Sequence, residues 1–211
     1  MAEHRVRAGL VGALAATLLL AGCGGGGGGP SLQLSDDGYY GTYLSDPYPL
    51  PATELTDTSG KAFSLAGSKA PVKIVFFGYT NCPDICQIVM STIASALSRL
   101  SDSQRAAVQV SFVTTDPARD TEKALRGYLD RFNPAFVGLT APLATITEAA
   151  QPLHVDIEKG QKLASGGYEV DHSTYVYGAA GNDTEVIWDQ GTSPKDMAAD
   201  IIKLLKQKET A

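Results

Sequence analysis

The stretch of sequence that decides the fold is Val72-Lys73-Ile74-Val75-Phe76-Phe77-Gly78-Tyr79-Thr80-Asn81-Cys82-Pro83-Asp84-Ile85-Cys86. It opens with an almost unbroken apolar run, which predicts a strand covered on both faces of a sheet. Apolar residues then recur on one helical stripe as far as Leu100. We therefore expect a helix from Pro83 to Leu100 with proline in its first turn. This arrangement places two cysteines at a strand-to-helix junction.

The two cysteines in this stretch, Cys82 and Cys86, are separated by three residues. With Cys82 in the loop and Cys86 in the first turns of the helix, the sulfurs can form a disulfide or bind a metal. A disulfide that closes so short a loop would stabilise the fold by only about 2 kcal/mol. A helix N-terminus favours the thiolate, whereas the like charge of Asp84 opposes it. We therefore expect the two cysteines to have a functional role and not to form a disulfide that only stabilises the fold.

From Thr53 onward the sequence alternates between strand and helix patterns. Further strands are expected at 108–114 and 136–139, and hairpin turns at 58–61 and 181–183. Further helices are expected at 121–132, up to about 151, and from Pro194 after the cap Ser193. Strands separated by helical crossovers predict an α/β fold with a central mixed sheet flanked by helices. A hairpin at each end and a thiol-bearing turn between them indicate a thioredoxin-like architecture.

The N-terminal residues have the pattern of an export signal. Arg5 and Arg7 precede an apolar run from Ala8 to Ala21 that is too short to span a bilayer. Leu20-Ala21-Gly22-Cys23 resembles the lipobox of bacterial lipoproteins, where the chain is cut before the cysteine and that cysteine is lipidated. An ordinary secreted protein cut elsewhere is the alternative. We expect the chain to be held by this lipid anchor on the outer, extracytoplasmic face of a bacterial cell membrane.

Three segments follow from this pattern. Residues 1–22 are expected to be a lipoprotein signal peptide, residues 23–52 the lipidated Cys23 with a glycine-rich flexible tether and an N-terminal extension, and residues 53–211 one folded domain. The whole sequence has 17 basic and 23 acidic residues, a net charge of −6. This acidic balance argues against a nucleic-acid partner, which would need a basic surface.

The chain has three histidines, and His4 would be removed with the expected signal peptide. His154 lies near a helix end with no polar or acidic residue directly beside it in the sequence, and it is interpreted as an ordinary structural residue. His172 lies in Asp171-His172-Ser173 after a glycine-rich loop, where a thioredoxin-like layout returns the chain beside the thiol loop. A lone histidine is more often structural than a ligand, so the residues alone leave both interpretations of His172 open.

Three motifs together carry a more specific resemblance. They are the segment 78–86, Asp116-Pro117-Ala118-Arg119-Asp120-Thr121, and Asp171-His172-Ser173. In this order and spacing they resemble the Sco/SenC family of copper chaperones, from about Leu55 to the last helix. The resemblance implies a thioredoxin-like fold with an additional N-terminal β-hairpin, and copper binding through Cys82, Cys86 and His172. The chain departs from the family pattern at Asn81, often histidine, and at Gln87, often proline; neither position is a ligand in the family.

The resemblance also implies a function. It implies a metallochaperone, not an enzyme, that helps to assemble the copper centre of cytochrome c oxidase subunit II by delivering copper, by reducing the target's cysteines, or by both. Its partners would be subunit II or another copper protein, and a copper donor protein. Two thiolates and an imidazole are soft ligands that suit Cu(I), with Cu(II) as a second oxidation state.

Two aspartates, Asp116 and Asp171, are candidates to orient the histidine or the loop. Each is equally well interpreted as a turn or cap residue. A second function also remains open, a metal-independent thiol–disulfide oxidoreductase acting on the cysteines of an exported partner. Oxidoreductases of this fold usually have two residues between the cysteines and a proline facing them. This chain has three residues there and no proline in Asp171-His172-Ser173, and both differences favour copper.

Overall fold

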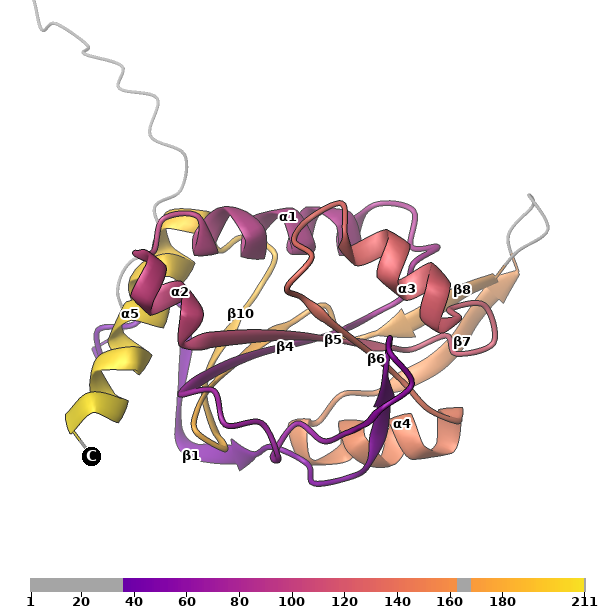
Figure 1. Cartoon of the computed structure of the whole chain (residues 1–211), viewed down its shortest axis with the longest axis horizontal. Coiled ribbons are helices and arrows are strands. Elements are labelled where there is room, and N and C mark those ends of the chain that lie inside the picture. Colours follow the sequence, from indigo (N-terminus) through magenta and orange to yellow (C-terminus); the bar gives the residue numbers. More distant parts are fainter. Residues whose placement is uncertain (1–35, 163–167, 211) are drawn as a thin grey trace, which may run out of the picture. The chain divides into compact units, whose positions relative to one another are not determined.

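The structure is a computed structural model that describes residues 36–162 and 168–210. Its elements in chain order (Figure 1) are β1 (Thr42–Pro49), β2 (Leu55–Asp57), β3 (Ala62–Phe63), β4 (Val72–Gly78), α1 (Ile85–Leu97), α2 (Asp102–Ala106), β5 (Val108–Thr114), α3 (Glu122–Leu129), β6 (Val137–Thr140), α4 (Leu143–Ala150), the 3₁₀ turn η1 (Gln151–Leu153), β7 (Ile157–Lys162), β8 (Tyr168–His172), β9 (Val176–Ala180), β10 (Asp183–Trp188) and α5 (Pro194–Thr210). No helix in these two ranges has the length and apolar character needed to cross a membrane.

Eight strands form one mixed sheet in the order β1-β10-β9-β4-β5-β6-β2-β3. The three strands β4, β5 and β6 run parallel to one another, and β9 runs antiparallel to β4. β7 and β8 pair with each other in a separate two-stranded sheet. Because β4 is paired with β9 on one side and β5 on the other, the loop that follows its carboxyl end leaves the sheet from an inner strand and not from an edge strand.

The side chains of β4 enter two separate cores, one on each face of the sheet. Ile74 and Phe76 pack with residues of α1, α3 and α5, whereas Val75 and Phe77 pack with residues of α4. Figure 1 shows α1 and α3 on one side of the sheet and α4 on the other. All seven residues of β4 are buried, as expected for a strand covered on both faces. The predicted central mixed sheet flanked by helices is confirmed.

The predicted N-terminal hairpin is confirmed as β2 and β3, which pair with each other beyond β6 at one edge of the sheet. Gly60 adopts a φ of +79° in its turn, a conformation that glycine adopts without strain. Asp57 Oδ1 accepts hydrogen bonds from the backbone N–H groups of Ser59 and Lys61, so the turn is closed by a side chain as well as by the strands.

The opposite edge of the sheet corrects the predicted domain boundary at residue 53. β1 precedes that boundary and pairs antiparallel with β10 in the main sheet. Its pairing is irregular between Tyr43 and Tyr48, and it contains Pro47 and Pro49. Proline is tolerated on an edge strand but weakens the strand signal in a sequence. The main sheet therefore begins at Thr42, inside the segment predicted to be an extension.

The residues just before β1 are also fixed to the fold. The buried carboxylate of Asp200 in α5 accepts hydrogen bonds from the backbone N–H groups of Tyr40 and Gly41 and from Trp188 Nε1. A Cβ at Gly41 would lie 2.7 Å from Trp188 Cδ1, so only glycine fits this close approach. The side chain of Tyr39 is buried, and its hydroxyl donates to Gln207 Oε1 at 3.0 Å. The chain is thus anchored to α5 before the sheet begins.

Candidate functional site

The loop between β4 and α1, residues 79–84, is called the thiol loop below. Helix α1 begins at Ile85, with the Asp84 side chain accepting a hydrogen bond from the Ile85 N–H as its N-cap. The prediction that the helix begins at Pro83 is therefore wrong by two residues, because Asp84 supplies the cap that ends the loop. Pro83 lies in the loop, and its fixed φ leads the chain into the cap. The predicted division of the cysteines is confirmed, with Cys82 in the loop and Cys86 in the first turn.

Both cysteines are buried, and they are not joined by a disulfide in the structure. Cys82 is 5% exposed and Cys86 is fully buried. The backbone N–H of Cys86 donates a hydrogen bond to Cys82 Sγ at 3.4 Å, and the N–H of Cys82 donates to the carbonyl of Tyr79 at 3.2 Å. The thiol pair is thus already brought together at the helix start without a covalent bond between the sulfurs.

The two thiols differ in acidity. The hydrogen bond from the Cys86 side chain, helped by the backbone N–H groups of Cys86 and Asp84, lowers the pKa of Cys82 to about 6. The same thiol–thiol hydrogen bond, followed by burial, raises the pKa of Cys86. The pair therefore favours a thiolate on Cys82 over a thiolate on Cys86. A thiolate is the form that acts as nucleophile and metal ligand.

Gly78, the last residue of β4, leaves room for the thiols. A Cβ on this residue would lie 3.1 Å from Cys86 Sγ and 2.8 Å from Phe76 Cε1. The Gly78 carbonyl accepts the N–H of Thr115 at 2.8 Å, so the backbone cannot move aside freely. The absence of a side chain at Gly78 is thus part of the site. Sequence reasoning quoted this glycine but gave it no role.

On the face of the sheet covered by α1, α3 and α5, an aromatic wall of Tyr128, Phe112 and Phe132 belongs to the same core as the thiols. The Tyr128 ring of α3 packs against Phe112, with ring centroids 5.5 Å apart, and against Phe132 at 5.2 Å. Burial, followed by the nearby charges of Cys86 and Cys82, raises the pKa of Tyr128. Its buried hydroxyl has no hydrogen-bond partner within the described part of the chain. The thiols and the Tyr128 ring therefore belong to the same buried core on this face of the sheet.

The predicted supporting residue Asp116 is buried and forms an ion pair with Arg119. The Arg119 guanidinium lies over the Tyr79 ring, 5.7 Å from its centroid, so this pair is connected to the thiol loop through a side-chain stack. The residue that contacts the loop directly is Asp120. Its carboxylate accepts the Thr80 N–H at 2.9 Å and the Thr114 hydroxyl at 2.7 Å. Sequence reasoning missed Asp120, although it lies in one of the three quoted motifs.

His172 is the last residue of β8 and is paired in register with Ile157 of β7. Four residues later the chain enters the main sheet at Val176, which is paired with Phe76 of β4. The backbone thus returns to the strand that precedes the thiol loop, as predicted. The side chains of His172 and Asp171 lie outside the described part of the structure, and so does Cys23 with the predicted signal peptide. Their predicted roles stay predictions.

The other histidine of the folded part, His154, ends η1 in the left-handed region with a φ of 54°. Its ring packs edge-on against the Tyr48 ring, with the two ring centroids 4.6 Å apart. η1 follows α4, which covers the face of the sheet opposite α1. Among the side chains that the structure describes, no three of His, Cys, Asp and Glu converge on a metal site. His154 is therefore not a third ligand to the cysteines in this structure.

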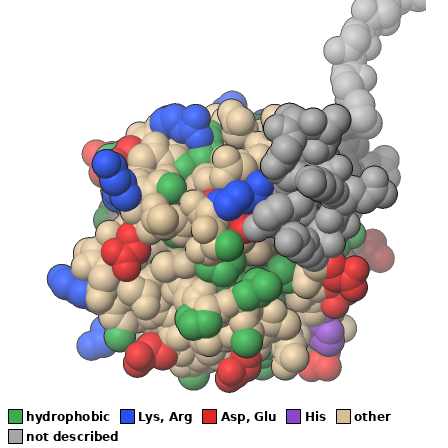
Figure 2. Space-filling model, turned by 90° about the vertical axis from the view of Figure 1, so that its right-hand side faces the viewer, with side chains coloured by type: hydrophobic (Ala, Val, Ile, Leu, Met, Phe, Trp, Pro, Cys, Tyr) green, Lys and Arg blue, Asp and Glu red, His purple; other side chains and the backbone are tan. Residues whose placement is uncertain are grey.

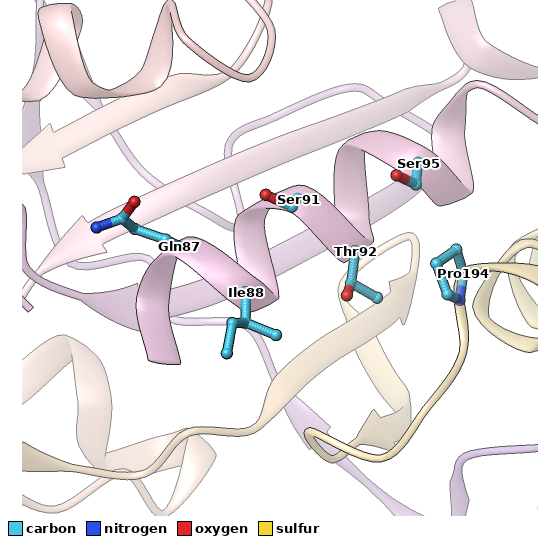
Figure 3. Close-up of a pocket in the computed structure, with 6 residues that line it drawn as sticks. All are labelled: Gln87, Ile88, Ser91, Thr92, Ser95 and Pro194. Carbon is cyan, nitrogen blue, oxygen red and sulfur yellow. The ribbon is translucent and has the colours of Figure 1, made fainter. Parts of the chain in front are cut away.

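A shallow groove of about 360 Å³ runs along the exposed side of α1, beginning one residue after Cys86. It is lined by Gln87, Ile88, Ser91, Thr92 and Ser95 of α1 and by Pro194 at the start of α5 (Figure 3). None of these side chains is charged, and Ile88 is 54% exposed.

Figure 2 shows the end of the fold where the β7–β8 hairpin projects, with hydrophobic side chains gathered in the middle of that face.

Comparisons with known proteins can now be set beside this geometry. A family model described as SCO1/SenC matches residues 50–206. The mitochondrial protein SCO2 of Saccharomyces cerevisiae is 34% identical over 124 residues, which cover 58% of this chain and 41% of that protein. The chain spans about half the length of the curated relatives it matches.

Two solved structures are similar over most of this chain. Apo Sco1 from Thermus thermophilus has a TM-score of 0.71 and 30% identity, covering 79% of this chain and 96% of that one. ScoI of Arabidopsis thaliana, solved with copper bound, has a TM-score of 0.68 and 26% identity, covering 77% of this chain and 99% of that one. The predicted thioredoxin-like fold is confirmed by this likeness.

Proposed function

This chain belongs to the SCO1/SenC family, and on that premise we propose that it is a copper metallochaperone that holds copper through Cys82, Cys86 and His172. Members of the family are copper-binding proteins involved in the assembly of cytochrome c oxidase. The relation supports copper as the cargo, and the ligand set is our assignment for this chain.

The observation that carries the proposal is the buried pair of cysteines, Cys82 and Cys86, brought together at the start of α1. Cys82 and Cys86 approach through a hydrogen bond at the start of α1, in the same buried core as the aromatic wall. Thiolate sulfur is a soft ligand that prefers Cu(I) to Mg²⁺ or Ca²⁺. Binding of Cu(I) releases the remaining thiol proton of Cys86, since a coordinating thiol is deprotonated. An imidazole from His172 would complete a three-coordinate site from which copper can be passed on.

We also propose that the copper centre of cytochrome c oxidase subunit II is the target, and that a separate donor protein supplies the metal. The chain would be held on the extracytoplasmic face of the membrane by lipid on Cys23. In support, the sequence before the folded part has the pattern of a lipoprotein signal followed by a glycine-rich tether. Such a tether would let the site search the membrane surface while the chain stays anchored.

Thiol–disulfide exchange with an exported partner is the second candidate function, and the acidity of Cys82 favours it. A pKa of about 6 gives a thiolate that can attack a disulfide at neutral pH. The attack would form a mixed disulfide, and Cys86 would then displace the reduced partner and leave a Cys82–Cys86 disulfide. Such a disulfide could not bind Cu(I), so oxidation would switch off metal binding. The two functions therefore use the same sulfurs in different redox states.

Loss of the gene in the source organism tests the proposed function. We expect oxidase activity to fall and to return with the wild-type gene but not with Cys82→Ser or Cys86→Ser. Rescue of the deletion strain by added copper would indicate copper delivery, whereas rescue by a small dithiol alone would indicate thiol reduction. Full activity with both serine variants would contradict both functions. A Cys23→Ala variant, measured for its distribution between membrane and soluble fractions, tests the anchor separately.

A further inference from the structure

Asp120 is a buried carboxylate outside the proposed ligand set. Its side chain is 1% exposed and accepts three hydrogen bonds from two residues. Oδ2 accepts the Thr80 N–H at 2.9 Å and the Thr114 hydroxyl at 2.7 Å, and Oδ1 accepts the Thr80 hydroxyl at 2.5 Å. Asp120 thus ties the thiol loop to the carboxyl end of β5.

This arrangement is costly for the fold alone. Burying a carboxylate away from water carries a large desolvation penalty, and Asp116 adds a second negative charge nearby. Among the ion pairs that the structure describes, none involves Asp120. Its three hydrogen bonds offset part of this penalty, and two of them hold the loop that carries the first proposed copper ligand.

We infer that Asp120 is a positioning residue that fixes the thiol loop so that Cys82 is held ready for copper; this inference rests on the proposed function. Thr80 lies two residues before Cys82, and Asp120 binds both its backbone and its hydroxyl. On the other side, Cys82 Sγ is held by the N–H of Cys86 in α1. Cys82 is thus restrained from both directions. A loop that is ordered before binding avoids the entropy cost of ordering it when copper arrives.

The hydrogen-bond pattern separates two substitutions at this position. In Asp120→Asn, the amide oxygen can take the place of Oδ2 and accept from the Thr80 N–H, while the amide nitrogen donates to the Thr80 hydroxyl. In Asp120→Ala, all three hydrogen bonds are lost. If Asp120 acts by positioning, asparagine should therefore preserve the loop and alanine should release it. Asp130→Ala is a control that removes a half-exposed carboxylate, because Asp130 is the C-cap residue of α3 and pairs with Arg126.

The experiment measures Cu(I) affinity of the full chain by competition with a chromophoric chelator, together with amide hydrogen exchange at Thr80. We expect Asp120→Ala to bind Cu(I) about 10- to 100-fold more weakly than wild type, as for loss of other groups that orient ligands. The Thr80 amide should also exchange at least tenfold faster. Asp120→Asn and Asp130→Ala should stay within about threefold of wild type in both measurements, since the loop keeps its ties.

Wild-type Cu(I) affinity in a folded Asp120→Ala variant would overturn the inference while leaving the proposed function intact. Absence of Cu(I) binding by the wild-type chain would instead contradict the proposed function, and the inference with it. A purely structural role would lower the melting temperature of Asp120→Ala without changing the Cu(I) affinity of the folded protein. If Asp120→Ala does not fold, Thr80→Val decides, because it removes one hydrogen bond of the three. We expect it to weaken Cu(I) binding several-fold, and an unchanged affinity would overturn the inference.

Discussion

The environment of each sulfur determines how the thiol pair reacts. Cys82 lies in the loop and is stabilised as a thiolate by the Cys86 side chain and by two backbone N–H groups. Cys86 lies inside the helix against Gly78 and is fully buried. Cys82 is therefore the sulfur that meets a metal ion or a disulfide first. Cys86 completes the reaction when its proton leaves.

The difference in acidity predicts the pH dependence of alkylation. A lowered pKa means that Cys82 is a thiolate above about pH 6 and is protonated below it. The rate of Cys82 alkylation by iodoacetamide should rise through pH 6 and level off by pH 7, whereas Cys86 should remain unmodified in the folded chain. Mass spectrometry of peptides from samples quenched between pH 4 and 9 measures both rates. A single midpoint near pH 8.5 for both cysteines, as in the urea-unfolded control, would contradict the assignment.

The missing side chain at Gly78 predicts that even alanine will disturb the site. The added methyl group would press on Cys86 Sγ and on the Phe76 ring. Overpacking of this kind costs about 1–3 kcal/mol of stability. We expect Gly78→Ala to lower the denaturation midpoint in urea and to weaken Cu(I) binding.

Gly127→Ala is the matched control for that substitution. Gly127 lies on the exposed side of α3, where a Cβ would meet nothing within 4 Å. Alanine is a better helix former than glycine, so this variant should gain about 0.5–1 kcal/mol and bind copper normally. Equal stability and affinity for Gly78→Ala and wild type would show that the site tolerates a side chain there.

At this scale the sequence predicted the two cysteines but not the residues that support them. Cys82 and Cys86 are recognisable because they are close in sequence and follow a strand. Asp120 lies 40 residues from Thr80, and no local pattern reveals a hydrogen bond over that separation. The prediction of Asp116 as a supporting residue found the correct segment of chain. The direct contact with the loop is made by Asp120, which lies four residues further along the same segment.

Among the elements, the start of α1 both caps the helix and influences the acidity of Cys82. Asp84 caps the helix, and its negative charge opposes the thiolate of Cys82 while its backbone N–H favours it. These two roles of Asp84 are separable by mutation, because capping needs an oxygen acceptor and the repulsion needs a charge.

Asp84→Asn should keep the cap and remove the charge, so the pKa of Cys82 should fall further while stability changes little. Asp84→Ala should also remove the cap and cost about 1 kcal/mol of unfolding free energy. Urea unfolding gives the stability of each variant, and the alkylation profile gives the pKa of Cys82. A rise in the Cys82 pKa in Asp84→Asn would mean that the carboxylate supports the thiolate rather than opposing it.

Strands with an unambiguous pattern were predicted to within one residue. β5 has the predicted bounds, and β4 extends the predicted strand by one residue. β4 is an almost unbroken apolar run, and in β5 Val108, Val110 and Phe112 alternate with the polar residues Gln109 and Ser111. α1 was predicted to begin too early, since proline suits a first helical turn as well as the loop before a cap. β1 was missed because its prolines and irregular pairing hide the strand pattern.

On the scale of the whole molecule, the order of the strands could not be predicted from local patterns. Alternating strands and helices predicted the mixed sheet, and the apolar character of β4 placed it centrally. The pairing of β1 with β10 joins residues about 140 positions apart. This pairing forms only in the folded chain. There, the Asp200 carboxylate accepts hydrogen bonds from the backbone N–H groups of Tyr40 and Gly41 and from the Trp188 side chain.

The early part of the chain should therefore be needed for stability. A chain that starts at residue 53 loses β1 and the buried side chains of Tyr39 and Leu50, whereas one that starts at residue 36 keeps them. Burial of two such side chains contributes about 3–5 kcal/mol, so the shorter chain should melt about 10 °C lower. Asp200→Ala in the longer chain should also lower the melting temperature, because it removes the acceptor for Trp188. Equal melting temperatures for the two chains would show that the stable domain begins at residue 53, as predicted from the sequence.

The most direct test of the three-ligand copper site is a Cu(I) titration of the reduced, purified chain against a competing chromophoric chelator. Wild type, His172→Ala and His154→Ala would be measured side by side. We predict one tightly bound Cu(I) per wild-type chain, an unchanged affinity for His154→Ala, and an affinity at least about 100-fold weaker for His172→Ala, since losing a ligand should cost at least as much as losing a group that orients one. Wild-type affinity in His172→Ala would contradict the three-ligand site.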